Sequence, residues 1–148
     1  MPVLLDVNVL LALVADRHAH HVIAKHWIHD MSAGDAVICR IVQISLLRLL
    51  NNPAVMQEEV LDTTACWEVW QGVLEDERFS FTVSEPPDLE LSFRRFCHGQ
   101  RFSPKLWTDA YLAAFAHAAG LTLVTFDRGF AIFPGLTLSL LTPDRLPH

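Results

Sequence analysis

The sequence lacks the features of membrane-spanning, secreted or disulfide-stabilised proteins. It has only three cysteines in 148 residues, and they are widely spaced with no CxxC pair. This pattern is typical of a reduced cytosolic protein. No uninterrupted run of about 18 apolar residues occurs, and the apolar N-terminal stretch has neither a basic region nor a small-residue cleavage site. We therefore expect a cytoplasmic protein with no membrane segment.

Basic residues are also scarce. The chain has 11 Lys and Arg against 17 Asp and Glu, which gives a net charge of −6, so its overall charge does not favour nucleic acid. The charges are unevenly distributed, however: residues 58–90 contain ten carboxylates and one basic residue, Arg78. Residues 94–105 contain no acid and form a basic block of Arg94, Arg95, His98, Arg101 and Lys105. A solvated surface explains both regions, and the basic block is also suited to contact phosphates.

Aliphatic segments alternate with helix-forming segments along the chain. The pattern predicts strands at 2–6, 36–39, 79–83, 121–125 and 136–141. It predicts helices at 8–15, 18–31, 41–50, 64–76, 88–97 and 105–119. Ser103 is expected to cap the last helix, with Pro104 at its first position. This alternation predicts an α/β fold with a mostly parallel central sheet and helices on both faces, in a single domain over residues 1–148.

Three aspartates fall where such a fold collects functional groups. Asp6 ends the first strand, Asp127 follows the strand 121–125, and Asp109 lies early in the helix before that strand. Because functional groups gather beyond the carboxyl ends of parallel strands, we expect all three to face one crevice. At about 6 Å, each pair of charges would repel by roughly 3 kcal/mol at an effective dielectric of about 20. A divalent cation would offset this repulsion.

The chemistry of these ligands favours one kind of ion and one kind of reaction. Carboxylate oxygens suit Mg²⁺ or Mn²⁺ rather than zinc. Such an ion activates water and stabilises the charge that develops in phosphodiester hydrolysis. Each aspartate also has an ordinary explanation: Asp6 as a helix cap, Asp109 as a residue that favours a helix N-terminus, and Asp127 as part of a turn. Their joint placement is what indicates a site.

A run of histidines raises the alternative of a zinc site. Its members are His18, His20, His21, His26 and His29. No cysteine lies close to them in the sequence, and their spacing matches no closed structural zinc site. The sequence therefore favours histidines on a helix surface or at an interface, and a structural role for His117 in the late helix.

The segments LLDVNVLLAL, LLRLLNNP and PKLWTDAYLAAFAHAAGLTLVTFDRGF together resemble PIN-domain proteins, in particular VapC-type toxin ribonucleases of bacterial toxin–antitoxin systems. The resemblance extends over nearly the whole chain. It implies a three-layer α/β/α PIN-like fold and a metal-dependent endoribonuclease that uses Mg²⁺ or Mn²⁺ to cut RNA. It also implies a homodimer, inhibited by a small VapB-like antitoxin that enters the acidic pocket.

The resemblance assigns roles to individual residues of this sequence. Asp6, Asp109 and Asp127 match the acidic metal ligands of the family, and Asn8 matches a polar position near the metal. Thr125 precedes Asp127 by two residues, so we expect it to face the same side of its strand and to orient a ligand or a water.

One position departs from the family pattern. Ser45 stands where most relatives have a glutamate, and its hydroxyl cannot supply the missing charge. The sequence then predicts three acidic ligands, with one firmly held ion and a second that is weaker or substrate-assisted. Gln43 is close in sequence but is expected on another helix face. Arg48 is placed to bind a phosphate or pair with an acid, although a solvent-facing arginine fits the position as well.

Two other functions stay open from the sequence. The chain could be a PIN-like module that binds RNA or an antitoxin without catalysis, which the serine at position 45 favours. Alternatively, DVNV resembles the nucleophile loop of haloacid-dehalogenase-type phosphatases, although Asn8 stands where that family has a second aspartate. A phosphatase of that class would form an aspartyl-phosphate on Asp6, which a metal-dependent nuclease does not.

Overall fold

The structure is a computed structural model that describes residues 1–142. Its strands are β1 (Val3–Leu5), β2 (Ala36–Cys39), β3 (Phe79–Thr82), β4 (Thr122–Thr125) and β5 (Leu138–Leu140). Its helices are α1 (Val7–Val14), α2 (His21–Ile28), α3 (Arg40–Leu50), α4 (Pro53–Met56), α5 (Thr63–Glu75), α6 (Leu89–Cys97) and α7 (Leu106–Ala119), with the short 3-10 helices η1 (Gln57–Glu59) and η2 (Arg128–Ile132). No described helix meets the length and apolarity that a membrane crossing requires.

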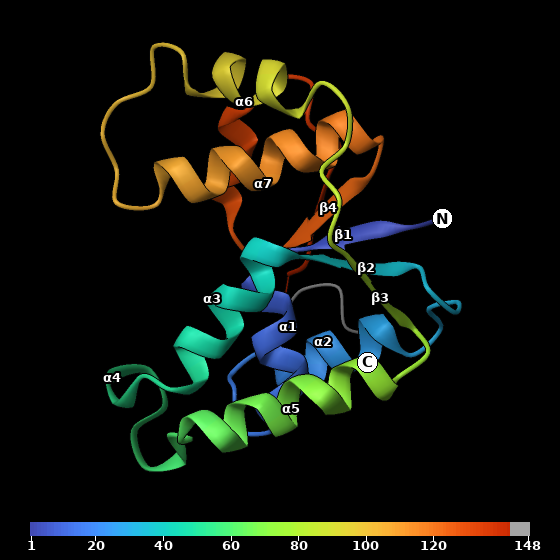
Figure 1. Ribbon diagram of the computed structural model, residues 1–148, viewed down its shortest axis with the longest axis vertical. Coiled ribbons are helices and arrows are strands. Elements are labelled where there is room, and N and C mark those ends of the chain that lie inside the picture. Colours follow the sequence, from blue (N-terminus) through green and yellow to red (C-terminus); the bar gives the residue numbers. More distant parts are fainter. Residues whose placement is uncertain (143–148) are drawn as a thin grey trace.

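Five parallel strands form one sheet in the order β3-β2-β1-β4-β5 (Figure 1). β1 is central, because Leu4 pairs with Val37 of β2 and with Leu123 of β4. The strand order reverses between β1 and β4. Ligand sites of parallel sheets form at such a reversal, beyond the carboxyl ends of the strands.

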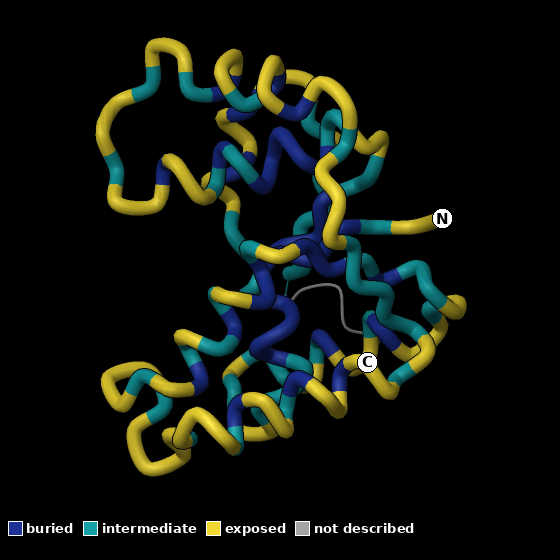
Figure 2. Tube along the Cα trace, viewed as in Figure 1, coloured by how far each residue is buried: buried dark blue, intermediate teal, exposed yellow. Residues whose placement is uncertain are grey.

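Both faces of the sheet are buried. Leu4 and Leu5 are each 0% exposed, and because successive strand residues point to opposite faces they enter different apolar clusters. Leu4 belongs to the cluster of Leu123, and Leu5 to the cluster of Val124. In Figure 1, α6 and α7 lie on one side of the strands, and α1, α2, α3 and α5 lie on the other. Figure 2 shows buried residues concentrated in the central strands and the inner helices. This architecture confirms the predicted α/β/α fold.

Helix ends differ from the prediction where side chains form local turns. The Oγ of Ser103 accepts a hydrogen bond from the Lys105 amide at 3.4 Å, and the Ser103 carbonyl accepts from the Leu106 amide at 3.1 Å. This turn delays the helix, so α7 starts at Leu106 and Lys105 takes the capping position. The expectation that Ser103 caps α7 is therefore wrong. In addition, Asn52 caps the short helix α4, which the sequence did not predict.

Candidate active site

Asp6 follows β1 and caps α1. Its Oδ1 accepts a hydrogen bond from the Val7 amide at 2.7 Å, and its Oδ2 accepts from the Thr125 hydroxyl at 2.7 Å. The residue is only 8% exposed. Burial raises the pKa of Asp6, and the bonds from Thr125 and Val7 partly oppose that shift. The cap expected from the sequence is present, but it uses one carboxylate oxygen and leaves the other directed toward β4.

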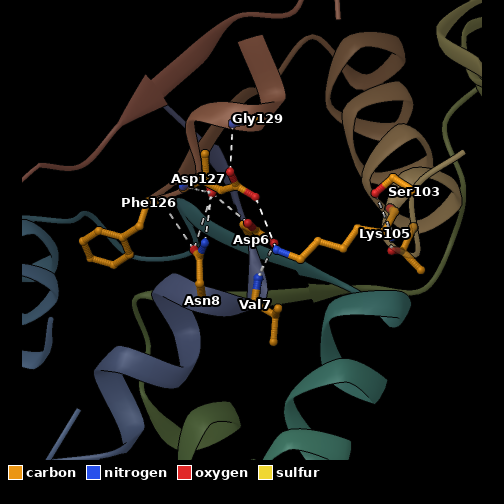
Figure 3. Close-up of polar contacts among 10 residues, drawn as sticks. Asp6, Val7, Asn8, Ser103, Lys105, Phe126, Asp127 and Gly129 are labelled. Carbon is orange, nitrogen blue, oxygen red and sulfur yellow. Dashed lines mark hydrogen bonds and ion pairs between the residues drawn. The ribbon is translucent and has the colours of Figure 1, made fainter. Parts of the chain in front are cut away.

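Thr125 joins Asp6 to the residues that follow β4. Its Oγ1 accepts from the Asp127 amide at 2.9 Å and from the Asn8 side-chain amide at 3.2 Å (Figure 3). The Oδ1 of Asn8 in turn accepts from the Phe126 amide at 3.3 Å. We call Asp6, Asn8, Thr125 and Asp127 the strand-end network. Thr125 thus contacts both Asp6 and Asp127, and its expected role in orienting a ligand or a water stays a prediction.

Gly129 fixes the other side of the Asp127 carboxylate. Its amide donates to Asp127 Oδ1 at 2.8 Å. A Cβ placed at Gly129 would lie 3.0 Å from that same oxygen. A side chain at this position would therefore push against the carboxylate that the backbone amide now holds.

Asp109 approaches the network from the first turn of α7. Burial, together with the charges of Asp6 and Asp127, raises the pKa of Asp109 to about 6. Asp6 and Asp127 are therefore close enough for their charges to oppose the ionisation of Asp109. Within residues 1–142, no hydrogen bond connects the Asp109 side chain to the other two acids.

Lys105 is the positive charge that faces these acids. Its Nζ lies 3.7 Å from Asp127 Oδ2, and its charge also lowers the pKa values of Asp6 and Asp109 against the opposing effects. Figure 3 shows its side chain extended from the start of α7 toward the acids. The sequence placed Lys105 in the basic block but missed this role. The available signal was the four-residue spacing between Lys105 and Asp109, because residues four apart in a helix lie on the same face.

The donor set suits a hard dication, but the side chains are not gathered around one point. It contains only oxygen donors, which Mg²⁺ and Mn²⁺ prefer, and mutual repulsion contributes to the raised pKa of Asp109. In the described part of the chain, no group of three or more His, Cys, Asp or Glu side chains is placed to hold a metal ion. The Asp127 carboxylate instead faces the Lys105 ammonium group, 3.7 Å away. The ligand assignment of Asp6, Asp109 and Asp127 therefore stays a prediction.

The two α3 residues singled out in the sequence have no described hydrogen bond or ion pair with this network. Ser45 is half-buried, and Arg48 is exposed and lines a surface cavity together with Trp67 of α5. Among the hydrogen bonds and ion pairs of the described residues, none joins Ser45 or Arg48 to the three acids. Their roles in positioning substrate or water stay predictions.

The histidines have structural contacts. His20 stacks on Phe126 with ring centroids 4.6 Å apart, next to the strand-end network. The Nδ1 of His21 hydrogen-bonds the Ala12 carbonyl at 2.7 Å. His26 and His29 are exposed, as expected for a helix surface, whereas His18, His20 and His21 are half-buried.

Comparison with known proteins identifies the fold and its family. The PIN domain matches residues 3–136. Ribonuclease VapC41 of Mycobacterium tuberculosis is 39% identical over 142 residues, covering 93% of this chain and 97% of the relative. Ribonuclease VapC29 of the same organism is 34% identical over 141 residues, covering 91% and 92%. The chain belongs to the PIN-domain family. Within that family its sequence groups with the VapC-type toxins, and the phosphatase alternative finds no support.

Solved structures agree on the fold. The crystal structure of VapBC2 from Rickettsia felis, bound to a DNA fragment from its promoter, gives a TM-score of 0.66 at 15% identity, covering 96% of this chain and all of that one. VapC20 of Mycobacterium tuberculosis, described as a sarcin–ricin loop cleaving toxin, gives 0.64 at 19% identity, covering 87% and 92%. At these identities the likeness concerns the fold alone.

Proposed function

We propose that this protein is a metal-dependent endoribonuclease that hydrolyses RNA phosphodiesters. The observation that carries the proposal is the pairing of Asp6 and Asp127 at adjacent strand ends through Thr125. The charge of each acts on Asp109. The similarity to ribonuclease VapC41 supports the same activity.

Asp6, Asp109 and Asp127 are the residues that would hold the ion. When bound, Mg²⁺ or Mn²⁺ supplies an activated water and neutralises charge on the phosphate. Thr125 donates to Asp6 Oδ2 and so fixes the direction of that carboxylate. Asn8 holds the backbone at Phe126, which positions the residue after it. Asp109 has to be ionised to bind a cation, so its proton must leave before the site is complete.

The basic block is our candidate for the RNA-contacting edge. Arg94 and Arg95 lie on the last turn of α6, and Arg101 lies in the segment that leads to α7. All three are exposed. α6 packs against α7, the helix that carries Asp109, so we expect RNA bound along these arginines to extend toward the acids. We also propose that the protein acts in the cytoplasm and is a homodimer.

A small VapB-like antitoxin is the proposed protein partner. Several solved structures of similar fold are complexes of a VapC or FitB chain with its VapB or FitA partner. An inhibitor of this kind would place basic or aromatic side chains against the acidic site. The test is to co-express this protein with the product of the neighbouring gene. If growth inhibition by this protein were not relieved and the two proteins formed no complex, the partner assignment would fail.

One alternative is favoured by particular observations. A PIN module that binds RNA or antitoxin without cutting would explain the serine at position 45 and the spacing of the acids. Calorimetric titration with Mn²⁺ distinguishes the two proposals. The nuclease requires binding that disappears in Asp6→Asn, together with RNA cleavage that EDTA stops. A module without catalysis shows neither.

A further inference from the structure

Lys105 acts on all three acids of the site. It forms the 3.7 Å ion pair with Asp127 and lies near enough to Asp6 and Asp109 for its charge to influence both. Its side chain is 73% exposed, so packing does not fix it in this position. An exposed ion pair of this length is weak. The ammonium group can therefore leave the acids when a stronger cation arrives.

A divalent cation and the lysine need the same oxygens. An ion held by the three aspartates would use the Asp127 carboxylate that Lys105 now contacts. The ion would also repel the ammonium group at short range. The divalent cation and the Lys105 ammonium group therefore cannot both contact the Asp127 carboxylate as closely as each would alone.

We propose that the Lys105 ammonium group is a counter-ion that the divalent cation must displace, so that Lys105 sets the metal affinity of the site. This inference rests on the proposed function, because it concerns the metal which that function requires. In the metal-free protein, Lys105 places one positive charge beside Asp127 and near Asp6 and Asp109. Metal binding releases the Lys105 side chain from Asp127 into the solvent.

The chain offers a closely matched control. It contains two lysines, and the other, Lys25, is exposed on α2 and lines a cavity beside Asp76 and Arg78. Lys105→Met and Lys25→Met remove the same side chain and the same charge. Comparing them separates the local effect at the acids from the change in net charge.

The test is calorimetric titration with MnCl₂ at neutral pH of the wild type, Lys105→Met, Lys105→Arg, Lys25→Met and Asp6→Asn. Removing the competing charge should tighten Mn²⁺ binding about three- to tenfold in Lys105→Met. Lys105→Arg and Lys25→Met should stay within about twofold of the wild type, because the first keeps the local charge and the second lies elsewhere. Circular dichroism checks that each variant is folded.

A second measurement follows Lys105 itself. Reductive ¹³C-methylation keeps the lysine charge, and two lysines give few signals to assign. Adding diamagnetic Mg²⁺ should shift the signal that is missing in Lys105→Arg and leave the Lys25 signal in place. A Lys105 signal that does not respond while Mg²⁺ binds would contradict displacement.

The outcomes separate this inference from the proposed function. Mn²⁺ binding that depends on Asp6 but is unchanged or weaker in Lys105→Met overturns the role of Lys105 and leaves the nuclease proposal standing. Absence of Asp6-dependent binding in both the wild type and Lys105→Met overturns both. Binding that appears only after Lys105 is replaced supports the inference in its strongest form.

Discussion

The two sides of the candidate active site are held together by different forces. The strand-end network is buried or half-buried, and hydrogen bonds of 2.7, 2.9 and 3.2 Å join its members. On the α7 side, Asp109 and Lys105 face the network through charge, and their nearest described contact with it is the 3.7 Å ion pair. Hydrogen bonds to backbone amides fix the orientation of a carboxylate, whereas an exposed ion pair does not fix the orientation of either side chain. One side is thus preformed, and the other is free to adjust when a ligand binds.

Among the substitutions, Asp6→Asn on the preformed side should cause the largest loss of RNA cleavage. The amide keeps the helix-capping oxygen, because Asn is as good a cap as Asp, but it removes the charge. We expect RNA cleavage to fall by at least about 100-fold, more than typical losses of residues that only support a ligand. A fluorogenic RNA assay measures the loss, and thermal unfolding should show a fold as stable as the wild type. A variant that cuts at the wild-type rate, with contaminating nuclease excluded, contradicts the proposal.

Asp109→Asn should have a similar or slightly smaller effect on cleavage. The substitution removes a proposed metal ligand from the adjustable side, and it also removes the repulsion of the Asp109 carboxylate by Asp6 and Asp127. The metal-free variant should therefore unfold at a higher temperature than the wild type at neutral pH. Differential scanning calorimetry with EDTA tests this. A lower unfolding temperature would mean that Asp109 stabilises the fold by contacts other than those described.

Thr125→Val removes the hydroxyl that connects the preformed side. Thr125 is 0% exposed, so the change leaves a buried carboxylate oxygen and the Asp127 amide without this partner. The expected loss of unfolding free energy is about 1–3 kcal/mol, with cleavage reduced about 10- to 100-fold. Thr122→Val on the same strand is the control. Equal effects at both positions would show that the Thr125 hydroxyl has no special role.

Acidic pH should weaken metal binding through Asp109. Its pKa in the folded chain is about 6, above the ordinary value of 3.8. The folded metal-free protein therefore holds this proton more tightly than the unfolded chain does, and the stability this contributes is present below pH 3.8 and lost as the pH rises through about 6. Metal binding has the opposite dependence, because the cation needs the ionised carboxylate. The affinity for the metal should rise by at most about tenfold per pH unit as the pH increases toward about 6. Mn²⁺ titrations at several pH values measure this slope, and Asp109→Asn should flatten it.

Charge reversal in the basic block should give the smallest effect. Arg94→Glu combined with Arg101→Glu is expected to raise the dissociation constant for RNA about two- to tenfold and to reduce its salt dependence. Fluorescence anisotropy with the inactive Asp6→Asn protein measures binding without cleavage. Lys25→Glu, on the far helix α2, controls for net charge. Unchanged RNA binding would remove these arginines from the proposed RNA edge.

The sequence predicted the preformed side well because local chemistry determines it. An aliphatic strand that ends in an aspartate, followed by a helix, identifies β1, the Asp6 cap and α1, and the two-residue spacing of Thr125 and Asp127 gives their shared direction. The strand order was not predictable, because β1 pairs with β4 far along the chain. The contact of Lys105 with Asp127 was missed since its side chain crosses between elements. The Ser103 cap was wrong because a local turn competes with the helix start.

The bond between Asp6 and Thr125 joins residues that are 119 positions apart in the chain. A ribosome therefore makes Asp6 long before it makes the residue that orients it. β4 must also insert beside β1 before the two side chains meet. A nascent chain, or a product truncated before β4, carries the first acid without its partners, so the assembled centre is absent from the protein throughout most of its own synthesis.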